Sequence, residues 1–190
     1  FGGSEDLISL YNRFEEQQIK DLRLDAFFEV IGDEQYKISK VGEKVYDCFV
    51  IRSAELYLNK AEAEAMLDKA EAKQTIKTLL NNRFEGGIPD VDGLNEKDLI
   101  SFIRDERRRE LCFEAHRWFD LRRYAVSPKY PEKKSIRHTA YDIKGKLEGD
   151  YVLKPYGEDP AWVLPIPGYE IVYNQDNLVD NPQRVERELE

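Results

Sequence analysis

Two glutamates one helical turn apart, Glu110 and Glu114, are the residues of this chain whose type and spacing could support catalysis. Paired carboxylates can act as the acid and the base of glycoside hydrolysis. Successive turns of one helix are nevertheless a poor place for such a pair, because both side chains project the same way and leave no room for a sugar between them. We therefore assign no catalytic residue and expect no enzymatic activity.

The same stretch favours a buried ionic network. Apolar residues recur along one face of the predicted helix, yet residues 104–110 contain no apolar side chain. If this helix is packed on two sides, its charges must be paired, because burying an unpaired charge costs several kcal/mol. Asp105 and Glu106 are each spaced to pair with Arg109, and Glu114 is spaced to pair with Arg117. The predicted structural network comprises Asp105, Glu106, Arg109, Glu110, Glu114 and Arg117.

Other catalytic or metal-binding patterns are absent from the sequence. His116 and His138 are the two histidines, and neither has a helical HExxH partner or a cysteine at metal-ligand spacing. No Gly-rich phosphate loop and no Ser-centred elbow occurs. We expect neither a metal ion nor a cofactor. Cys48 and Cys112 do not indicate a redox compartment, and Cys112 is predicted to fill core space within a helix.

Aromatic residues make up 12% of the chain and could stack on sugar rings. Trp118 and Phe119 continue the helical stripe, and Trp162 adjoins an apolar segment, so we predict that all three belong to the core. Tyrosines in the irregular last third could either contact ligand or cover an edge of the core. The candidates for ligand contact are Tyr130, Tyr141 and Tyr156.

The first elements that must position these residues are a helix and a hairpin. Ser4 reads as a helix start, and the apolar period that follows predicts a helix to about Gln18. Alternating apolar residues on both sides of Gly32-Asp33 predict a β-hairpin near 27–41.

Two tightly joined helices are predicted next. Residues 51–65 carry a stripe rich in alanine, which lets another helix approach closely, and residues 72–84 have a second apolar face. Asp68 and Glu71 are spaced as a capping box for the second helix. An antiparallel pair of this kind is the unit of tetratricopeptide arrays, although the sequence contains no second copy at a fixed period.

A long charged helix follows a Gly- and Pro-containing loop. Asn95 is suited to cap it, and the pattern predicts one continuous helix to about Tyr124, a rod on the order of 45 Å long. Beyond it, prolines and glycines limit the elements to short ones. We predict two short strands around Tyr141 and Tyr151, a third at 162–164, and a short helix from Pro167 to Ile171.

These patterns predict a mainly α fold with tetratricopeptide-like helical hairpins, a long charged helix, and a few short strands and irregular segments. We expect a single domain over 1–190, mostly helical over 1–124, with loops, short strands and a short helix over 125–182 and a charged tail over 183–190. A net charge of -9 with mixed signs disfavours binding to nucleic acid or to an anionic membrane face. The chain starts Phe-Gly-Gly, so we expect that an export signal and a lipid-carrying cysteine lie upstream.

Several motifs follow one another along the chain: IRSAELYLNKAEAEA at 51–65, LNNR at 80–83, ERRREL, FEAHR and WFDLRR within 106–123, LPIPGYEI at 164–171 and Asn181-Pro182. In this order they resemble the motifs of the SusD/RagB family of outer-membrane glycan-binding lipoproteins. Asp21 and Arg23 also fall where that family has a D-x-R. Ala115 departs from the pattern, since the family commonly has Gly there, a change that a helix would accept easily.

The resemblance implies a function in binding. It implies a surface-exposed lipoprotein of the cell outer membrane that captures a glycan or oligosaccharide and passes it to a SusC-like, TonB-dependent transporter. The present chain would be the carboxyl-terminal part of such a protein. Two alternatives are a stand-alone helical adaptor that binds other proteins, and a glycoside hydrolase using Glu110 and Glu114.

Overall fold

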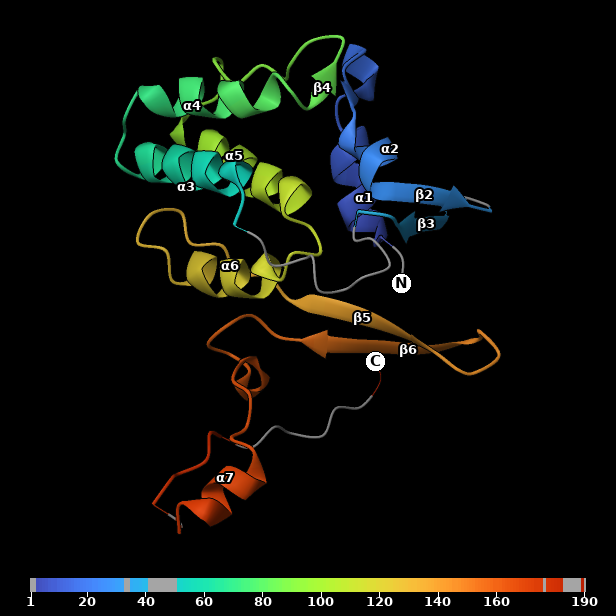
Figure 1. Ribbon diagram of the computed structural model, residues 1–190, viewed down its shortest axis with the longest axis vertical. Coiled ribbons are helices and arrows are strands. Elements are labelled where there is room, and N and C mark those ends of the chain that lie inside the picture. The colour runs from blue at the N-terminus through green and yellow to red at the C-terminus, as the bar shows by residue number, and fades with distance from the viewer. Residues whose placement is uncertain (1–2, 33–34, 41–50, 176, 183–188, 190) are drawn as a thin grey trace. The chain divides into compact units, whose positions relative to one another are not determined.

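The computed structural model describes residues 3–32, 35–40, 51–175, 177–182 and 189. Helices predominate and the strands form two-stranded sheets, which confirms the predicted mainly α class (Figure 1). The chain divides into two compact units, Phe1–Trp118 and Phe119–Glu190. The single-domain organisation stays a prediction. Cys48, the end of the predicted hairpin at Val41 and most of the tail at 183–190 lie outside the described residues.

The first unit opens with a helix that is shorter than predicted. α1 (Glu5–Asn12) buries Leu7, Ile8, Leu10 and Tyr11, and it is followed by the 3-10 helix η1 (Glu15–Gln17). The chain leaves the helical conformation before Gln18, whose φ of 60° is left-handed. Ser4 stands at the N-cap, but its hydroxyl donates to the carboxylate of Asp6 at 2.6 Å instead of capping the backbone.

Two small sheets flank this start. β1 (Lys20–Asp21) pairs antiparallel with β4 (Phe84–Glu85), and α2 (Arg23–Phe27) follows β1 directly. β2 (Phe28–Ile31) pairs with β3 (Gln35–Ile38), which confirms the predicted hairpin over its described residues. Phe28 is buried and packs edge-on against Tyr11 at 5.6 Å between ring centroids, so the hairpin is fixed to α1.

Longer helices follow in the described part of this unit (Figure 1): α3 (Ser53–Met66), α4 (Glu71–Leu80) and α5 (Glu96–Glu110). α3 packs against both α4 and α5. The buried apolar residues of α3 are Ala54, Leu58, Ala61 and Ala65, and the small side chains of the three alanines permit close approach.

The helix starts were predicted with mixed success. Asn95 caps α5 as expected, since its side chain accepts from the backbone N–H of Asp98 at 3.0 Å. The predicted capping box of Asp68 and Glu71 is wrong. α4 begins at Glu71 after Ala70, and Asp68 has a left-handed φ of 56° ahead of the helix.

The predicted continuous helix to about Tyr124 is also wrong. α5 ends at Glu110, and five residues, 111–115, separate it from α6 (His116–Ala125). Phe113 and Ala115 both have a φ of 62°, a left-handed conformation that a right-handed helix cannot contain. Ala115 is therefore not a helical position, and the glycine that the resemblance led us to expect there would suit its backbone better.

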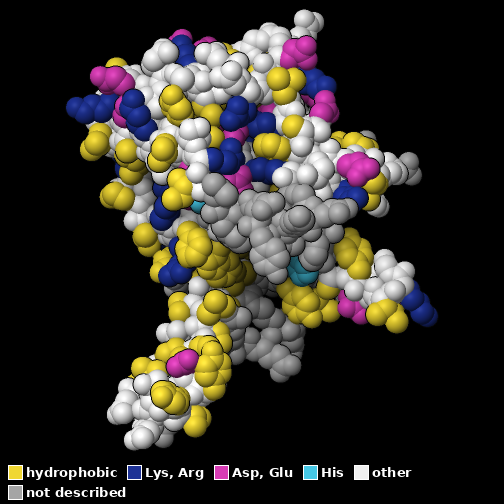
Figure 2. Space-filling model, viewed as in Figure 1, with side chains coloured by type: hydrophobic (Ala, Val, Ile, Leu, Met, Phe, Trp, Pro, Cys, Tyr) yellow, Lys and Arg dark blue, Asp and Glu magenta, His cyan; other side chains and the backbone are white. Residues whose placement is uncertain are grey.

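The second unit contains short elements. β5 (Ile136–Tyr141) and β6 (Leu147–Leu153) form an antiparallel pair across a turn that contains Gly145, as predicted. The predicted strand at 162–164 is wrong, because Trp162 ends the 3-10 helix η3 (Pro160–Trp162). The last helix, α7 (Gly168–Tyr173), begins after Pro167 and carries exposed apolar side chains near the foot of the view in Figure 2.

Candidate functional site

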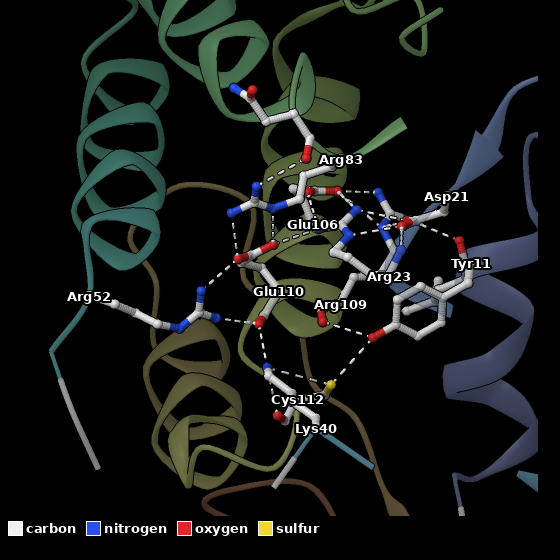
Figure 3. Close-up of polar contacts among 12 residues, drawn as sticks. Tyr11, Asp21, Arg23, Lys40, Arg52, Arg83, Glu106, Arg109, Glu110 and Cys112 are labelled. Atoms are coloured by element: carbon white, nitrogen blue, oxygen red, sulfur yellow. Dashed lines mark hydrogen bonds and ion pairs between the residues drawn. The ribbon is translucent and has the colours of Figure 1, made fainter. Parts of the chain in front are cut away.

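The charged part of α5 is buried because this helix packs against both α3 and α1. Apolar residues could have filled these positions, but the sequence places charges there, so each charge needs a partner. The partners come from elements far away in the sequence (Figure 3). The buried charged residues of α5 are Arg104, Glu106, Arg107, Arg109 and Glu110.

Arg23, the first residue of α2, lies at the centre of the network (Figure 3). Its Nε and Nη2 donate to the two carboxylate oxygens of Asp21 at 2.9 and 2.7 Å. Its Nη1 donates to Glu106 at 2.5 Å and to Glu110 at 2.9 Å. Burial alone would lower the pKa of Arg23, but the charge of Glu106 and the hydrogen bond to Asp21 raise it, so the guanidinium stays charged.

Arg109 is fully buried beside Arg23. Its Nε and Nη2 donate to Glu106 Oε2 at 3.0 and 2.6 Å, and its Nη1 donates to the carbonyl of Leu10 at 3.1 Å. The guanidinium also lies over the rings of Phe14 and Phe102, 5.7 and 5.8 Å from their centroids. Burial raises the pKa of Glu106, but the charges of Arg23 and Arg109 outweigh it, and the pKa is lowered overall.

Glu110 accepts hydrogen bonds from three guanidinium groups. Arg83, which precedes β4, donates at 2.8 and 3.0 Å, and Arg52, which precedes α3, donates at 2.7 Å. Arg23 completes the set at 2.9 Å. Burial would raise the pKa of Glu110, but the hydrogen bond from Arg83 and the charge of Arg23, followed by Arg52, lower it to about 2. This carboxylate therefore joins the start of α3, the start of α2 and the segment after α4 to α5.

Glu114 extends the network into the turn after α5. Arg52 donates to it through Nε and Nη2 at 2.9 and 2.7 Å, and Lys40 contacts it at 2.5 Å. Lys40 also donates to the backbone carbonyls of Glu110 and Cys112, at 2.6 and 3.0 Å. These bonds satisfy carbonyl groups that the end of a helix leaves without partners. Burial raises the pKa of Glu114, but Arg52 and Lys40 lower it overall.

Tyr11 and Cys112 close the network on the side of α1. The hydroxyl of Tyr11 donates to the carbonyl of Arg109 at 2.8 Å and lies 3.3 Å from Cys112 Sγ. Burial raises the pKa of both side chains, so both are protonated at neutral pH. Cys112 is buried as predicted, but it lies in the turn after α5 and not within a helix.

The six residues predicted for this network do not all lie within it. Glu106, Arg109 and Glu110 lie within it, and Glu114 lies at its edge. Asp105 instead pairs with Arg13 at 2.9 Å, nearer the surface. Arg117 is half-buried in α6. It acts on Asp6: burial alone would raise the pKa of Asp6, but the hydrogen bonds from Ser4 and Arg108 and the charges of Arg108 and Arg117 lower it overall.

The candidate tyrosines lie in the second unit and have different neighbours. Tyr156 packs edge-on against the buried Trp162, 5.9 Å between ring centroids. Tyr130 has a left-handed φ of 51° and lies 6.0 Å from the ammonium of Lys129. Tyr141 is 62% exposed at the irregular end of β5.

The three residues predicted to be core aromatics differ in burial. Trp162 is 2% exposed, Trp118 is half-buried, and Phe119 is 64% exposed. The prediction is therefore wrong for Phe119. It assumed that one helical stripe runs from α5 into α6, and the break at 111–115 interrupts that stripe.

Five charged residues that bind the carboxylates or carbonyl groups of this network could not be found from helical spacing, because they lie in segments that precede α5 in the sequence. Four of them stood in motifs that carried the family resemblance, which was the available signal: Asp21, Arg23, Arg52 and Arg83, the last residue of the LNNR motif. Lys40 carried no comparable signal.

The geometry of Glu110 and Glu114 is that of members of an ionic network. A glycosidase needs one carboxylic acid that is protonated at working pH and can donate to the leaving group. The pKa values of Glu110 and Glu114 are both lowered, and both carboxylates are occupied by guanidinium or ammonium donors. Among the described residues, no group of His, Cys, Asp or Glu side chains is arranged to hold a metal ion.

Comparison with known proteins identifies the family of this chain. Residues 23–183 match the SusD family, and this span includes Arg23 and all of α5. The chain belongs to the SusD family. SusD-like protein P38 of Formosa agariphila is 35% identical over 113 residues, which cover 55% of this chain and 21% of that protein. SusD-like protein P2 of the same organism is 27% identical over 147 residues, which cover 70% of this chain and 25% of that protein.

This SusD-family chain therefore spans about a fifth to a quarter of the length of the curated relatives that it matches. Within the part of the chain that the structure describes, no helix combines the length and the apolar character needed to cross a bilayer.

Proposed function

We propose that the intact protein is a non-catalytic glycan-binding component of nutrient uptake at the cell outer membrane. It captures an oligosaccharide and passes it to a SusC-like, TonB-dependent transporter, and a lipid anchor upstream of this chain holds it at the cell surface. The match to the SusD family over residues 23–183 is the observation that carries this proposal.

In this proposal the present chain is the scaffold of the carboxyl-terminal part. The network supports this role, because Glu110 alone binds arginines that lie 27, 58 and 87 residues away in the sequence. We propose further that α3 and α4 form a tetratricopeptide-like hairpin, which their close packing through alanines supports. Tyr130, Tyr141 and Tyr156 remain the aromatic side chains of the second unit that we propose for ligand contact.

The absence of catalysis is part of the same proposal. It is supported by the ionised state of Glu110 and Glu114, which leaves neither carboxyl group with a proton to donate near neutral pH. The rival glycosidase hypothesis requires that proton.

Calorimetric titration of the intact natural protein with a panel of oligosaccharides tests the proposal. The panel should contain hexasaccharides of glucose, mannose, xylose and galacturonic acid. We expect saturable binding of at least one of them. Failure of every oligosaccharide to bind would contradict the proposal.

A further inference from the structure

A pocket of about 420 Å³ lies on the first unit, away from the centre of the ionic network. Its walls come from the end of α1, from η1, from the segment that leads into α5 and from α5 itself. The volume is within the range of about 300–1,000 Å³ that is typical of sites for small ligands. Its polar lining consists of Arg13, Gln17, Asp90, Asp98, Ser101 and Asp105.

The pocket is held open by contacts between its walls. Arg13 and Asp105 form an ion pair at 2.9 Å that joins the end of α1 to α5. Phe14 and Phe102 also line the pocket, and their rings pack together with 6.3 Å between centroids. Both rings contact the buried Arg109, so the ionic network supports this wall directly.

The segment 90–94 forms a fixed wall as well. Val91 is fully buried, and Lys73 of α4 donates to the carbonyls of Asp92 and Leu94 at 2.6 and 2.9 Å. Lys77 pairs with the carboxylate of Asp92. A pre-formed pocket binds its ligand without the cost of ordering its walls.

The lining has the chemistry of a site for sugar hydroxyl groups. Neighbouring hydroxyls on a pyranose can donate to one carboxylate and accept from an amide or a guanidinium. Asp90 uses one carboxylate oxygen to accept from the backbone N–H groups of Asp92 and Gly93, and Asp98 uses one to accept from Asn95. Among the described residues, the second oxygen of Asp90 and of Asp98 makes no hydrogen bond, so each can accept from a ligand.

Charge restricts the class of sugar. The lining contains three carboxylates and one guanidinium, and that guanidinium is already paired with Asp105. An anionic sugar would meet the uncompensated charges of Asp90 and Asp98 at close range, which disfavours binding. Neutral sugars carry no such penalty.

We propose that this pocket is a contact site for a neutral oligosaccharide, an inference that rests on the proposed glycan-binding function. Ser101 lies on the exposed face of α5 that lines the pocket, so Ser101→Trp would fill the space without removing a buried group. Ala63, an exposed residue of α3 that does not line the pocket, provides the matched control Ala63→Trp.

The experiment is calorimetric titration of the intact natural protein and both variants with neutral glucose, mannose and xylose hexasaccharides and with hexagalacturonate. We expect the wild type and Ala63→Trp to bind a neutral hexasaccharide alike, and Ser101→Trp to bind it at least about tenfold more weakly. Circular dichroism and thermal unfolding establish that both variants are folded.

Equal binding of the neutral sugar by Ser101→Trp and wild type would overturn the pocket assignment and leave the proposed function standing. Tighter binding of hexagalacturonate that Ser101→Trp also abolishes would overturn the assignment to neutral sugars. Binding of no oligosaccharide by the wild type would instead overturn the proposed function itself, and the pocket assignment with it.

Discussion

At the scale of single residues, the account depends most on Glu110. Its side chain is 1% exposed and binds Arg23, Arg52 and Arg83. Removing the charge of Glu110 takes one counter-charge from each of these three arginines, although Arg23 keeps Asp21 and Glu106 and Arg52 keeps Glu114. Because Glu110 itself is buried, this costs more than the loss of an exposed pair.

We therefore expect Glu110→Gln to lower the free energy of unfolding by about 3–5 kcal/mol. The matched control is Glu158→Gln, which breaks an exposed pair with Lys133 and should change stability by no more than about 0.5 kcal/mol. Urea denaturation followed by circular dichroism measures both. A loss for Glu110→Gln as small as that of the control would mean that the network does not hold the fold.

The lowered pKa of Glu110 also predicts how stability depends on pH. The ordinary pKa of 4.5 applies in the unfolded chain, and the folded value is about 2. Above the unfolded pKa, the ionised Glu110 therefore stabilises the folded protein by on the order of 3 kcal/mol. This stabilisation is lost as the pH falls from about 5 towards 2. Urea denaturation across this range should show a smaller fall in stability for Glu110→Gln than for wild type; parallel curves would contradict the assignment.

Ala115 is a second residue whose backbone conformation leads to a testable prediction. Its φ of 62° is costly for any residue with a Cβ. We expect Ala115→Gly to stabilise the protein by about 0.5–1 kcal/mol, even after the greater entropy of glycine in the unfolded chain is counted. Ala63→Gly, within α3, should instead destabilise by about 1 kcal/mol. Thermal unfolding compares them, and a loss of stability at both positions would indicate that residue 115 is helical.

At the scale of elements, the packing of α3 against α4 and α5 depends on small side chains. Ala61 is fully buried, so Ala61→Leu would force extra methyl groups into a filled interface. We expect a loss of about 1–3 kcal/mol. The same change at the exposed Ala63 should cost little. Urea denaturation that found both variants equally stable would indicate that the helices are not closely packed at Ala61.

The elements that the sequence predicted well are those with a local pattern. Alternation over 28–38 predicted β2 and β3, and the alanine-rich period predicted α3. The end of α5 at Glu110 has no such pattern, because Phe113 and Ala115 adopt left-handed conformations that tertiary contacts, and not their own preferences, impose. The apolar stripe that continues from Leu111 to Trp118 and Leu121 therefore suggested one helix where there are two.

The candidate site was predictable only in part, for a related reason. Spacing within a helix relates Glu106 to Arg109, and that contact is present. It cannot relate Glu110 to Arg52, because their contact depends on how α3 is placed against α5. The pairing of Asp105 with Arg13 was missed in the same way.

At the scale of the whole molecule, the chain is a SusD-family segment whose buried charges organise its first unit. The network includes Glu110 and Glu114, the two glutamates that were considered as a catalytic pair. Both carboxylates are ionised and bound to basic side chains. Phe14 and Phe102 line the pocket and also contact Arg109 of the network, so loss of the network should also disturb the pocket.

The most direct test of the central claim, binding without turnover, is chromatographic analysis of an oligosaccharide after prolonged incubation with the intact natural protein. The sugar used should be the one that binds most tightly in calorimetry. We predict that it is recovered uncleaved at every time. Cleavage products that form with wild type, and that disappear in folded Glu110→Gln and Glu114→Gln proteins, would contradict the account.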